Sequence, residues 1–205
     1  MKRIRSHTGV LTWVSDACVV GGVVVLLSPL VWIAWTGWAA TDAQTAALAA
    51  WERGAPRHAS RSGRLAATSG GFVLTIPRLG LRRWVPEGAT VDHLRRYGVG
   101  HISWTAEPGG WGVVGIAGHR TTYGAPFFAL DRLRSSDLIQ IDDGRRRYVY
   151  SVVGHTTVTP DRAGLLQGRP ADREVALVTC APPYSAALRL VVFGTLRATA
   201  DDAGP

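Results

Sequence analysis

An uncharged apolar stretch near the N-terminus constrains the architecture of this chain more than any other feature. Ala17 to Ala40 spans 24 residues without a charged side chain, and Lys2, Arg3 and Arg5 precede it. A membrane-spanning helix needs about 20 apolar residues, and flanking basic residues stay on the cytoplasmic side. The sequence therefore predicts residues 1–40 to be a cytoplasmic basic tip and a transmembrane signal anchor, with the rest of the chain outside the cell.

The composition of the stretch favours an anchor that is retained. Pro29 lies within it, where a membrane helix tolerates proline as a kink, and Trp32, Trp35 and Trp38 lie toward its outer end, where indole rings favour the membrane interface. A signal peptide cleaved near Gly37 is the alternative, but the apolar run is longer than a usual signal core. We therefore expect a single-pass protein of the plasma membrane with its N-terminus in the cytoplasm.

The character of the sequence changes after the apolar stretch. Thr41 to Trp51 is rich in alanine and predicts a short helix, whereas Arg53 to Gly71 is rich in glycine, serine, arginine and proline. Segments of this composition connect domains without a core of their own. We interpret residues 41–71 as an extracellular stalk, and residues 199–205 as a flexible tail.

Short strand-like runs bounded by glycine, proline and aspartate fill residues 72–198. Two short helices are expected among them, at Thr90–Leu94 with Thr90 as the N-cap and at Pro126–Leu133. Many short strands with few helices predict a mostly β fold, either a closed barrel or a sandwich, because closure removes exposed edges. The expected strands are Phe72–Ile76, Leu81–Val85, Val113–Ala117, Leu138–Ile141, Arg147–Val153, Thr156–Thr159, Val175–Thr179 and Leu190–Leu196.

Charge and composition exclude several classes of function. The formal net charge of +8 is spread along the chain, with no basic run longer than Arg145–Arg147, which argues against nucleic acid as a partner. Asp142–Asp143 and Asp172–Glu174 lack the spacing of a calcium loop. The sequence predicts no metal and no cofactor.

Cys180 is the only cysteine outside the apolar stretch, and it ends the strand-like run Val175–Cys180. A disulfide within the outer domain is therefore impossible, and the thiol is buried and inert, paired between chains, or reactive. His119 follows the expected strand Val113–Ala117, and Arg189 lies in an apolar strand where a cation needs a partner. A thiol, a base and a fixed cation at strand ends are typical of acyl transfer. The role of His101, in the expected loop Gly98–His101, stays open.

The motifs around these residues resemble those of the sortases, and among them the class E sortases of actinobacteria. Ala117 to Phe127 resembles the class E histidine motif, and Leu177–Cys180 with Arg189 matches the spacing of the family's cysteine and arginine. Ala176 departs from the usual Thr-Leu-x-Thr-Cys pattern, and the segment Ser103–Trp111 departs from the expected Pro-Gly loop. The resemblance covers residues 72–196.

The resemblance implies an eight-stranded sortase barrel and a cysteine transpeptidase with an acyl-enzyme mechanism. Cys180 would attack a threonine carbonyl, His119 would protonate the leaving glycine amine, and Arg189 would hold the carbonyl and its oxyanion. The substrates would be surface proteins that bear a C-terminal sorting signal cut between threonine and glycine. The acceptor would be an amine of lipid II or peptidoglycan.

The resemblance also implies substrate-binding residues and a preferred signal. Tyr123 matches the motif tyrosine associated with Leu-Ala-x-Thr-Gly signals, and Thr122 and Thr179 are its expected partners in substrate binding. Three alternatives stay open: a pilin-polymerising sortase, for which no Asp-Pro-Trp-like lid is visible; a Cys/His hydrolase that releases its product to water; and a non-catalytic barrel that binds surface ligands.

Overall fold

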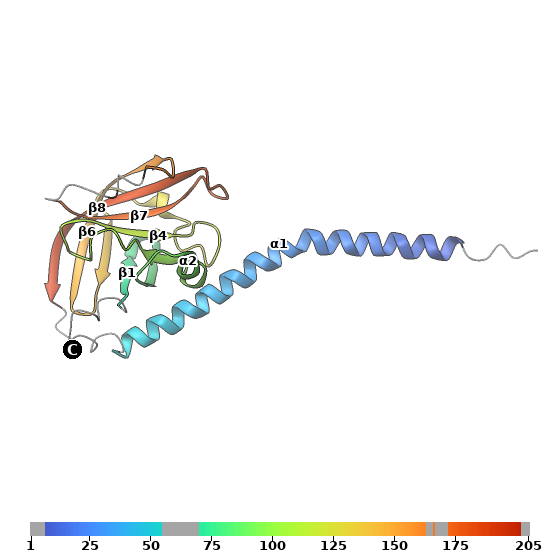
Figure 1. Cartoon of the computed structure of the whole chain (residues 1–205), viewed down its shortest axis with the longest axis horizontal. Coiled ribbons are helices and arrows are strands. Elements are labelled where there is room, and N and C mark those ends of the chain that lie inside the picture. Colours follow the sequence, from blue (N-terminus) through green and yellow to red (C-terminus); the bar gives the residue numbers. More distant parts are fainter. Residues whose placement is uncertain (1–6, 55–69, 163–165, 167–171, 202–205) are drawn as a thin grey trace, which may run out of the picture.

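One long helix and one eight-stranded sheet make up the computed structural model, which describes residues 7–54, 70–162, 166 and 172–201. The N-terminal part of helix α1 (His7–Glu52) extends away from the sheet, and its C-terminal part lies along it (Figure 1). Residues 55–69 of the expected stalk and residues 202–205 of the expected tail lie outside the described residues.

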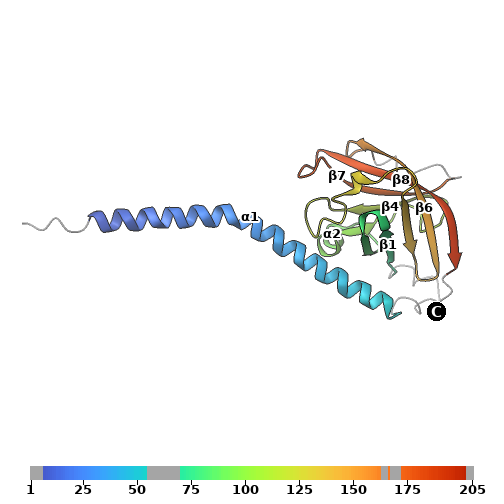
Figure 2. The same cartoon turned by 180° about the vertical axis from the view of Figure 1, so that it is seen from behind.

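Helix α1 joins two segments that the sequence analysis separates. It runs through the apolar stretch and the alanine-rich segment, so the short helix expected at Thr41–Trp51 is its C-terminal part. Neither glycine nor proline occurs between Trp38 and Arg53, so nothing in the sequence ends the helix there. Pro29 lies inside the helix, which changes direction part-way along its length (Figure 2). The helix from Asp16 onward has the length and composition of a membrane span, and its most apolar 18-residue window has a mean hydropathy of 2.4.

The eight strands form a single sheet in the order β2-β1-β5-β6-β8-β7-β4-β3. Strands β4 and β7 are parallel, and the other neighbours are antiparallel. The strands are β1 (Phe72–Ile76), β2 (Leu81–Val85), β3 (Val99–His101), β4 (Gly112–Gly118), β5 (Leu138–Asp142), β6 (Arg146–Val158), β7 (Arg173–Ala181) and β8 (Leu188–Asp201).

The two edges of the sheet meet just after β2, at a seam made by Pro86, Glu87 and His101. The backbone N–H of His101 on β3 donates to the Pro86 carbonyl at 2.9 Å, and Glu87 forms an isolated bridge with His101. This contact curls the sheet into a nearly closed barrel. The predicted mostly β, eight-stranded barrel is confirmed.

Three details of the predicted elements differ from the structure. The strands expected at 147–153 and 156–159 are one strand, β6, in which Gly154 accompanies a register shift rather than a turn. Strand β3 was not predicted because it has only three residues. The helix expected at Pro126–Leu133 is wrong, because the segment contains only the 3-10 turn η3 (Leu130–Arg132).

Two other short elements flank the sheet. Helix α2 (Val91–Tyr97) confirms the helix predicted at Thr90–Leu94. The Thr90 side chain accepts a hydrogen bond from the His93 N–H as the expected N-cap. A 3-10 turn, η2 (Pro77–Leu79), connects β1 to β2.

Apolar side chains pack on both faces of strands β4, β7 and β8. The larger cluster, which includes Leu74, Ile116 and Leu177, fills the barrel. A smaller cluster on the outer face includes Val113, Ala176 and Val191. Side chains alternate between the two faces along a strand, so the outer face continues toward the strand ends where the chemistry-bearing residues lie.

Candidate active site

Cys180 and Arg189 are held opposite each other by the pairing of β7 with β8. They are direct partners in the antiparallel register. Directly opposed residues have side chains on the same face of the sheet. Cys180 lies four residues after Ala176 and Arg189 two before Val191, so alternation places both on the outer face rather than inside the barrel.

His119 joins them through the parallel pairing of β4 with β7. The last pair of that register is Ala117 with Val178, and His119 and Cys180 each follow two residues later. The backbone of His119 is fixed on both sides, since its N–H donates to the Gly98 carbonyl at 2.9 Å and its carbonyl accepts from the Phe127 N–H at 3.1 Å. The topology therefore brings the three residues expected to be catalytic to one corner of the outer face.

The imidazole of His119 has unused hydrogen-bonding capacity. Its Nε2 atom is buried and has no hydrogen-bond partner among the described residues, and its Nδ1 atom has a 3.3 Å contact with the Thr122 hydroxyl. Burial lowers the pKa of His119, and the positive charge of Arg95 on α2 lowers it further. A neutral imidazole with a free ring nitrogen is suited to exchange a proton with a reacting group.

The guanidinium of Arg189 is anchored to the β7–β8 connection. Its Nη1 atom donates to the carbonyls of Ala186 at 2.9 Å and Leu188 at 3.0 Å. A guanidinium carries five N–H donors, and within the described part of the chain the groups on Nε and Nη2 remain for another acceptor. The arrangement fixes the cation and leaves a donor pair suited to a substrate oxygen.

Arg120 contributes to the corner in a way that the sequence analysis missed. It is 6% exposed, and its Nη1 atom donates to the carbonyl of Cys180 at 3.3 Å while Nη2 pairs with Asp131 at 3.2 Å. This side chain therefore ties the loop after His119 to the backbone of Cys180. The signal for it was its place next to His119 in the motif, but its partner is 60 residues away in the sequence.

The three expected substrate-binding residues lie in different surroundings. The ring of Tyr123 lies against the ring of His119, with centroids 4.8 Å apart, and Thr122 contacts the same imidazole. Thr179 is 2% exposed, and its hydroxyl donates to the Gly118 carbonyl at 2.8 Å. Thr179 thus joins β7 to β4 below the corner, and a role of any of the three in substrate binding stays a prediction.

An apolar pocket of about 310 Å³ adjoins the corner. Arg189 lines it together with Ala117 and Val178, which lie two residues before His119 and Cys180 on the same face. Trp104 and Ile102, from the β3–β4 connection, form another wall. The sequence analysis did not predict this pocket, because its walls come from segments that only the barrel brings together.

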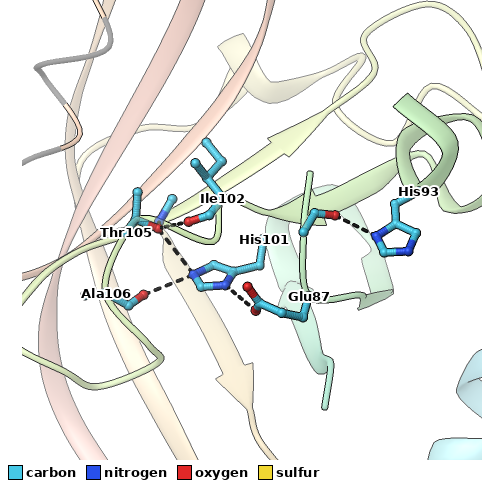
Figure 3. Close-up of polar contacts among 8 residues, drawn as sticks. Glu87, His93, His101, Ile102, Thr105 and Ala106 are labelled. Atoms are coloured by element: carbon cyan, nitrogen blue, oxygen red, sulfur yellow. Dashed lines mark hydrogen bonds and ion pairs between the residues drawn. The ribbon is translucent and has the colours of Figure 1, made fainter. Parts of the chain in front are cut away.

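A second polar cluster lies at the seam of the barrel (Figure 3). His101 is fully buried, with Nδ1 2.6 Å from a carboxylate oxygen of Glu87 and Nε2 3.1 Å from the Ala106 carbonyl. A carbonyl only accepts, so Nε2 carries a proton and donates to it, and Nδ1 is held by its contact with Glu87. Burial raises the pKa of the neighbouring Glu107.

Within the described residues, Glu87, His101 and Glu107 form the one group with the composition of a metal site, with ligand atoms within 4.8 Å of one another. The sequence analysis did not anticipate this group. Both ring nitrogens of His101 already have protein partners, and the cluster joins the segment after β2 to the β3–β4 connection. Its observed contacts close the barrel.

Comparisons with known proteins agree with this geometry. The sortase domain family model matches residues 74–197. Sortase SrtE1 from Streptomyces coelicolor is 30% identical over 141 residues, which are 62% of this chain and 40% of that protein, and sortase A from Bacillus anthracis is 33% identical over 91 residues, 44% of this chain and 43% of that protein. The chain thus spans less than half the length of these curated relatives.

Solved structures extend the similarity to the fold. The crystal structure of sortase E1 from Streptomyces coelicolor with a tripeptide in the active site has a TM-score of 0.62 at 27% identity, and sortase E from Streptomyces avermitilis has 0.60 at 30% identity. Each match covers 67% of this chain and 95% of the solved chain. The chain belongs to the sortase family, and its relatives support the class E assignment that the histidine motif predicted.

Proposed function

We propose that this protein is a membrane-anchored cysteine transpeptidase that cleaves a sorting signal between threonine and glycine and joins the substrate protein to a cell-wall amine. The observation that carries the proposal is the corner formed by Cys180, His119 and Arg189, in which a buried imidazole nitrogen lacks a partner among the described residues. A buried polar atom without a partner is costly to stability, and such atoms persist where a reaction uses them.

The first half-reaction forms a thioester. The thiolate of Cys180 attacks the threonine carbonyl carbon, and the free N–H groups of Arg189 stabilise the oxyanion of the tetrahedral intermediate. When the intermediate collapses, the peptide C–N bond breaks and the His119 imidazolium donates a proton to the leaving glycine amine. The threonine acyl group stays on the sulfur.

The second half-reaction transfers the acyl group. An acceptor amine attacks the thioester carbonyl and gives its proton to the now neutral His119, and the C–S bond breaks to return the Cys180 thiolate. Because burial and Arg95 lower the pKa of His119, the imidazolium is a minority form at neutral pH.

The sorting signal would occupy the apolar pocket beside the corner. The volume of about 310 Å³ and the apolar walls suit the leucine and alanine side chains of a Leu-Ala-x-Thr-Gly signal. The tripeptide in the active site of the Streptomyces coelicolor relative supports a peptide as the substrate. Tyr123 and Thr122, which contact the His119 ring, would face the signal near the scissile bond.

The proposed location follows from α1. Basic residues before the apolar stretch would keep the N-terminus in the cytoplasm, and Trp35 and Trp38 are exposed on the helix where it would leave the outer interface. Substrate proteins and a lipid II acceptor are themselves tethered to the membrane. Confining all three to one surface raises their effective concentration.

The test uses the full chain in detergent micelles and a quenched Leu-Ala-x-Thr-Gly peptide. Cleavage should fall to background in Cys180→Ala, and mass spectrometry of the wild-type products should show an amide adduct when an amino-acid amine is added. Replacing alanine with proline in the peptide should reduce the cleavage rate. Full cleavage by Cys180→Ala would refute the catalytic proposal, and water-only products at high amine concentration would favour a hydrolase.

A further inference from the structure

The C-terminal part of α1 is a docked helix rather than a free tether. Ala40 and Trp51 are each 2% exposed and Gln44 is 3% exposed. Offsets of four and eleven residues place all three on one face of a helix, and that face lies against the barrel. Figures 1 and 2 show this half of α1 beside α2 and the neighbouring strands. The membrane helix and the catalytic domain therefore share a packed interface.

Gln44 links three elements at this interface. Its Nε2 atom donates to the carbonyls of Trp84 on β2 at 2.8 Å and Tyr97 on α2 at 2.7 Å, and its Oε1 atom accepts from the Trp84 N–H at 2.9 Å. Both amide hydrogens are used. A buried side chain with these bonds fixes the position of α1 against α2, because any displacement would leave polar groups unpaired.

One path from α1 to the catalytic histidine runs through the end of α2. Tyr97, which accepts from Gln44, is followed by Gly98, and the Gly98 carbonyl accepts from the His119 N–H at 2.9 Å. Gly98 is the left-handed C-cap of α2, with φ of 75°. The backbone of His119 is thus one residue removed from the point where α1 holds α2.

A second path runs through the loop that follows His119. Small residues on α1 let its backbone approach Gly124: a Cβ at Gly124 would lie 3.7 Å from the Thr41 hydroxyl, 3.9 Å from the Ala40 Cβ and 3.9 Å from the Gly37 carbonyl. The preceding residue, Tyr123, has its ring against the His119 imidazole. The side chain of His119 is thus also one residue removed from α1.

The two paths support each other. A Cβ at Gly98 would come within 2.7 Å of the Tyr123 carbonyl, so the backbones of the two paths are in direct contact. The imidazole itself has few restraints, because Nε2 has no partner in the described part of the chain and the Thr122 contact is 3.3 Å long. The orientation of the ring therefore depends on the backbone at Gly98 and at Tyr123–Gly124, and both segments are held by α1.

We propose that the docked half of α1, residues 36–52, is a positioning element for His119, with Gln44 and Gly37 as its positioning residues. The proposal rests on the catalytic role of His119 given above. It makes the membrane anchor part of the support of the active site, so that anchoring and catalytic geometry are set by one helix. In both views the end of the barrel with the β7–β8 connection points in the direction in which α1 leaves the barrel (Figures 1 and 2).

The first test compares Gln44→Ala with Thr45→Ala, an exposed neighbour on the same helix. In the full chain in micelles, Gln44→Ala should lower kcat for peptide cleavage by about 10-fold with KM nearly unchanged, because misplacement of a catalytic group costs rate more than binding. NMR of histidine-labelled protein should show the His119 resonance shifted and its pKa raised, as α2 and the buried surroundings loosen. Thr45→Ala should match the wild type in both measurements.

The second test leaves Gln44 and its hydrogen bonds unchanged. Gly37→Leu places a large side chain against Gly124 and should push α1 from the loop, whereas Ala39→Leu adds a leucine at an exposed position. Gly37→Leu should reproduce the loss of kcat and the change at His119, and Ala39→Leu should not. This pair decides the matter if Gln44→Ala does not fold.

A loss of stability without a change in catalysis would contradict the proposal. If Gly37→Leu and Gln44→Ala lower the melting temperature but keep the wild-type kcat and His119 titration, α1 only stabilises the barrel and the proposal is wrong. Failure of the proposed function looks different: Cys180→Ala would then cleave as well as the wild type, while the His119 titration would still report whether α1 positions the ring.

Discussion

Two histidines with buried ring nitrogens, the fully buried His101 and the partly buried His119, lie at the two ends of the β3–β4 pair and differ in their hydrogen bonds. His101 lies on β3 opposite Ile116 of β4, and His119 follows β4 with its N–H bonded to Gly98, next to the start of β3. Both ring nitrogens of His101 have partners in the protein. Nε2 of His119 has none within the described residues.

The difference separates a histidine that joins two segments from one that keeps a ring nitrogen free for the proposed proton transfer. At the seam, a carboxylate and a carbonyl satisfy the imidazole of His101, so it can join two segments without reacting. At the corner, an imidazole that is mostly buried keeps a free nitrogen, at a cost of about 1–3 kcal/mol for an unsatisfied buried group. Burial alone therefore does not distinguish the two histidines, whereas the unused nitrogen of His119 agrees with the catalytic role proposed for it.

The largest effect is expected from removing the unsatisfied histidine. His119→Ala should reduce the rate of signal-peptide cleavage by about 10²–10⁴-fold, the range that general acid–base groups contribute. Its thermal stability should stay near that of the wild type, since a costly buried group is lost with few hydrogen bonds. Peptide cleavage and circular-dichroism melts check both parts, with His155→Ala, at an exposed position, as the control. If His119→Ala lost as much stability as a substitution of Glu87 at the seam, the distinction between His119 and His101 would be wrong.

An effect of intermediate size, on stability and not on the cleavage rate, is expected at the seam. Glu87→Gln keeps the shape of the side chain but replaces a carboxylate oxygen, the hydrogen-bond partner of His101, with an amide, and it should lower the free energy of unfolding by about 1–3 kcal/mol. Cleavage by the folded fraction should be unchanged, because the seam does not touch Cys180 or Arg189. Chemical denaturation and active-site-normalised kinetics provide the measurements. A loss of kcat with unaltered stability would show that the seam acts on catalysis.

Sequence alone predicts the residues of the corner better than the residues that hold them in position. Cys180, His119 and Arg189 are recognised because each lies within a local motif at a strand end, and strand pairing then brings them together. Gln44 and Arg120 carry no such signal, since the carbonyls of Trp84, Tyr97 and Cys180 to which they donate lie 40 or more residues away and are backbone groups that any residue could offer.

The same limit explains the misassigned elements. Strand β3 has three residues, and only its pairing with β4 distinguishes it from a loop. Gly154 reads as a turn because glycine weakens a strand, but the long pairing of β6 with β8 absorbs it as an irregularity. Docking of α1 through Gln44 was not predicted, because an alanine-rich segment suits a solvated helix as well as a packed one.

The smallest expected effect concerns the charge near the unsatisfied histidine. Arg95→Gln should raise the pKa of His119 only part of the way toward its ordinary value, because burial is the larger cause of the depression and remains in place. A depressed pKa means that the unfolded state binds more protons than the folded state near and below pH 6.5, so acidification destabilises the wild type. The variant should lose less stability than the wild type between pH 7 and about pH 5.

Histidine NMR titration measures the pKa of His119, and pH-dependent melts measure the stability. Arg96→Gln, on the same turn of α2, is the matched control. Equal titration curves for Arg95→Gln and Arg96→Gln would mean that α2 tunes His119 through packing and not through charge.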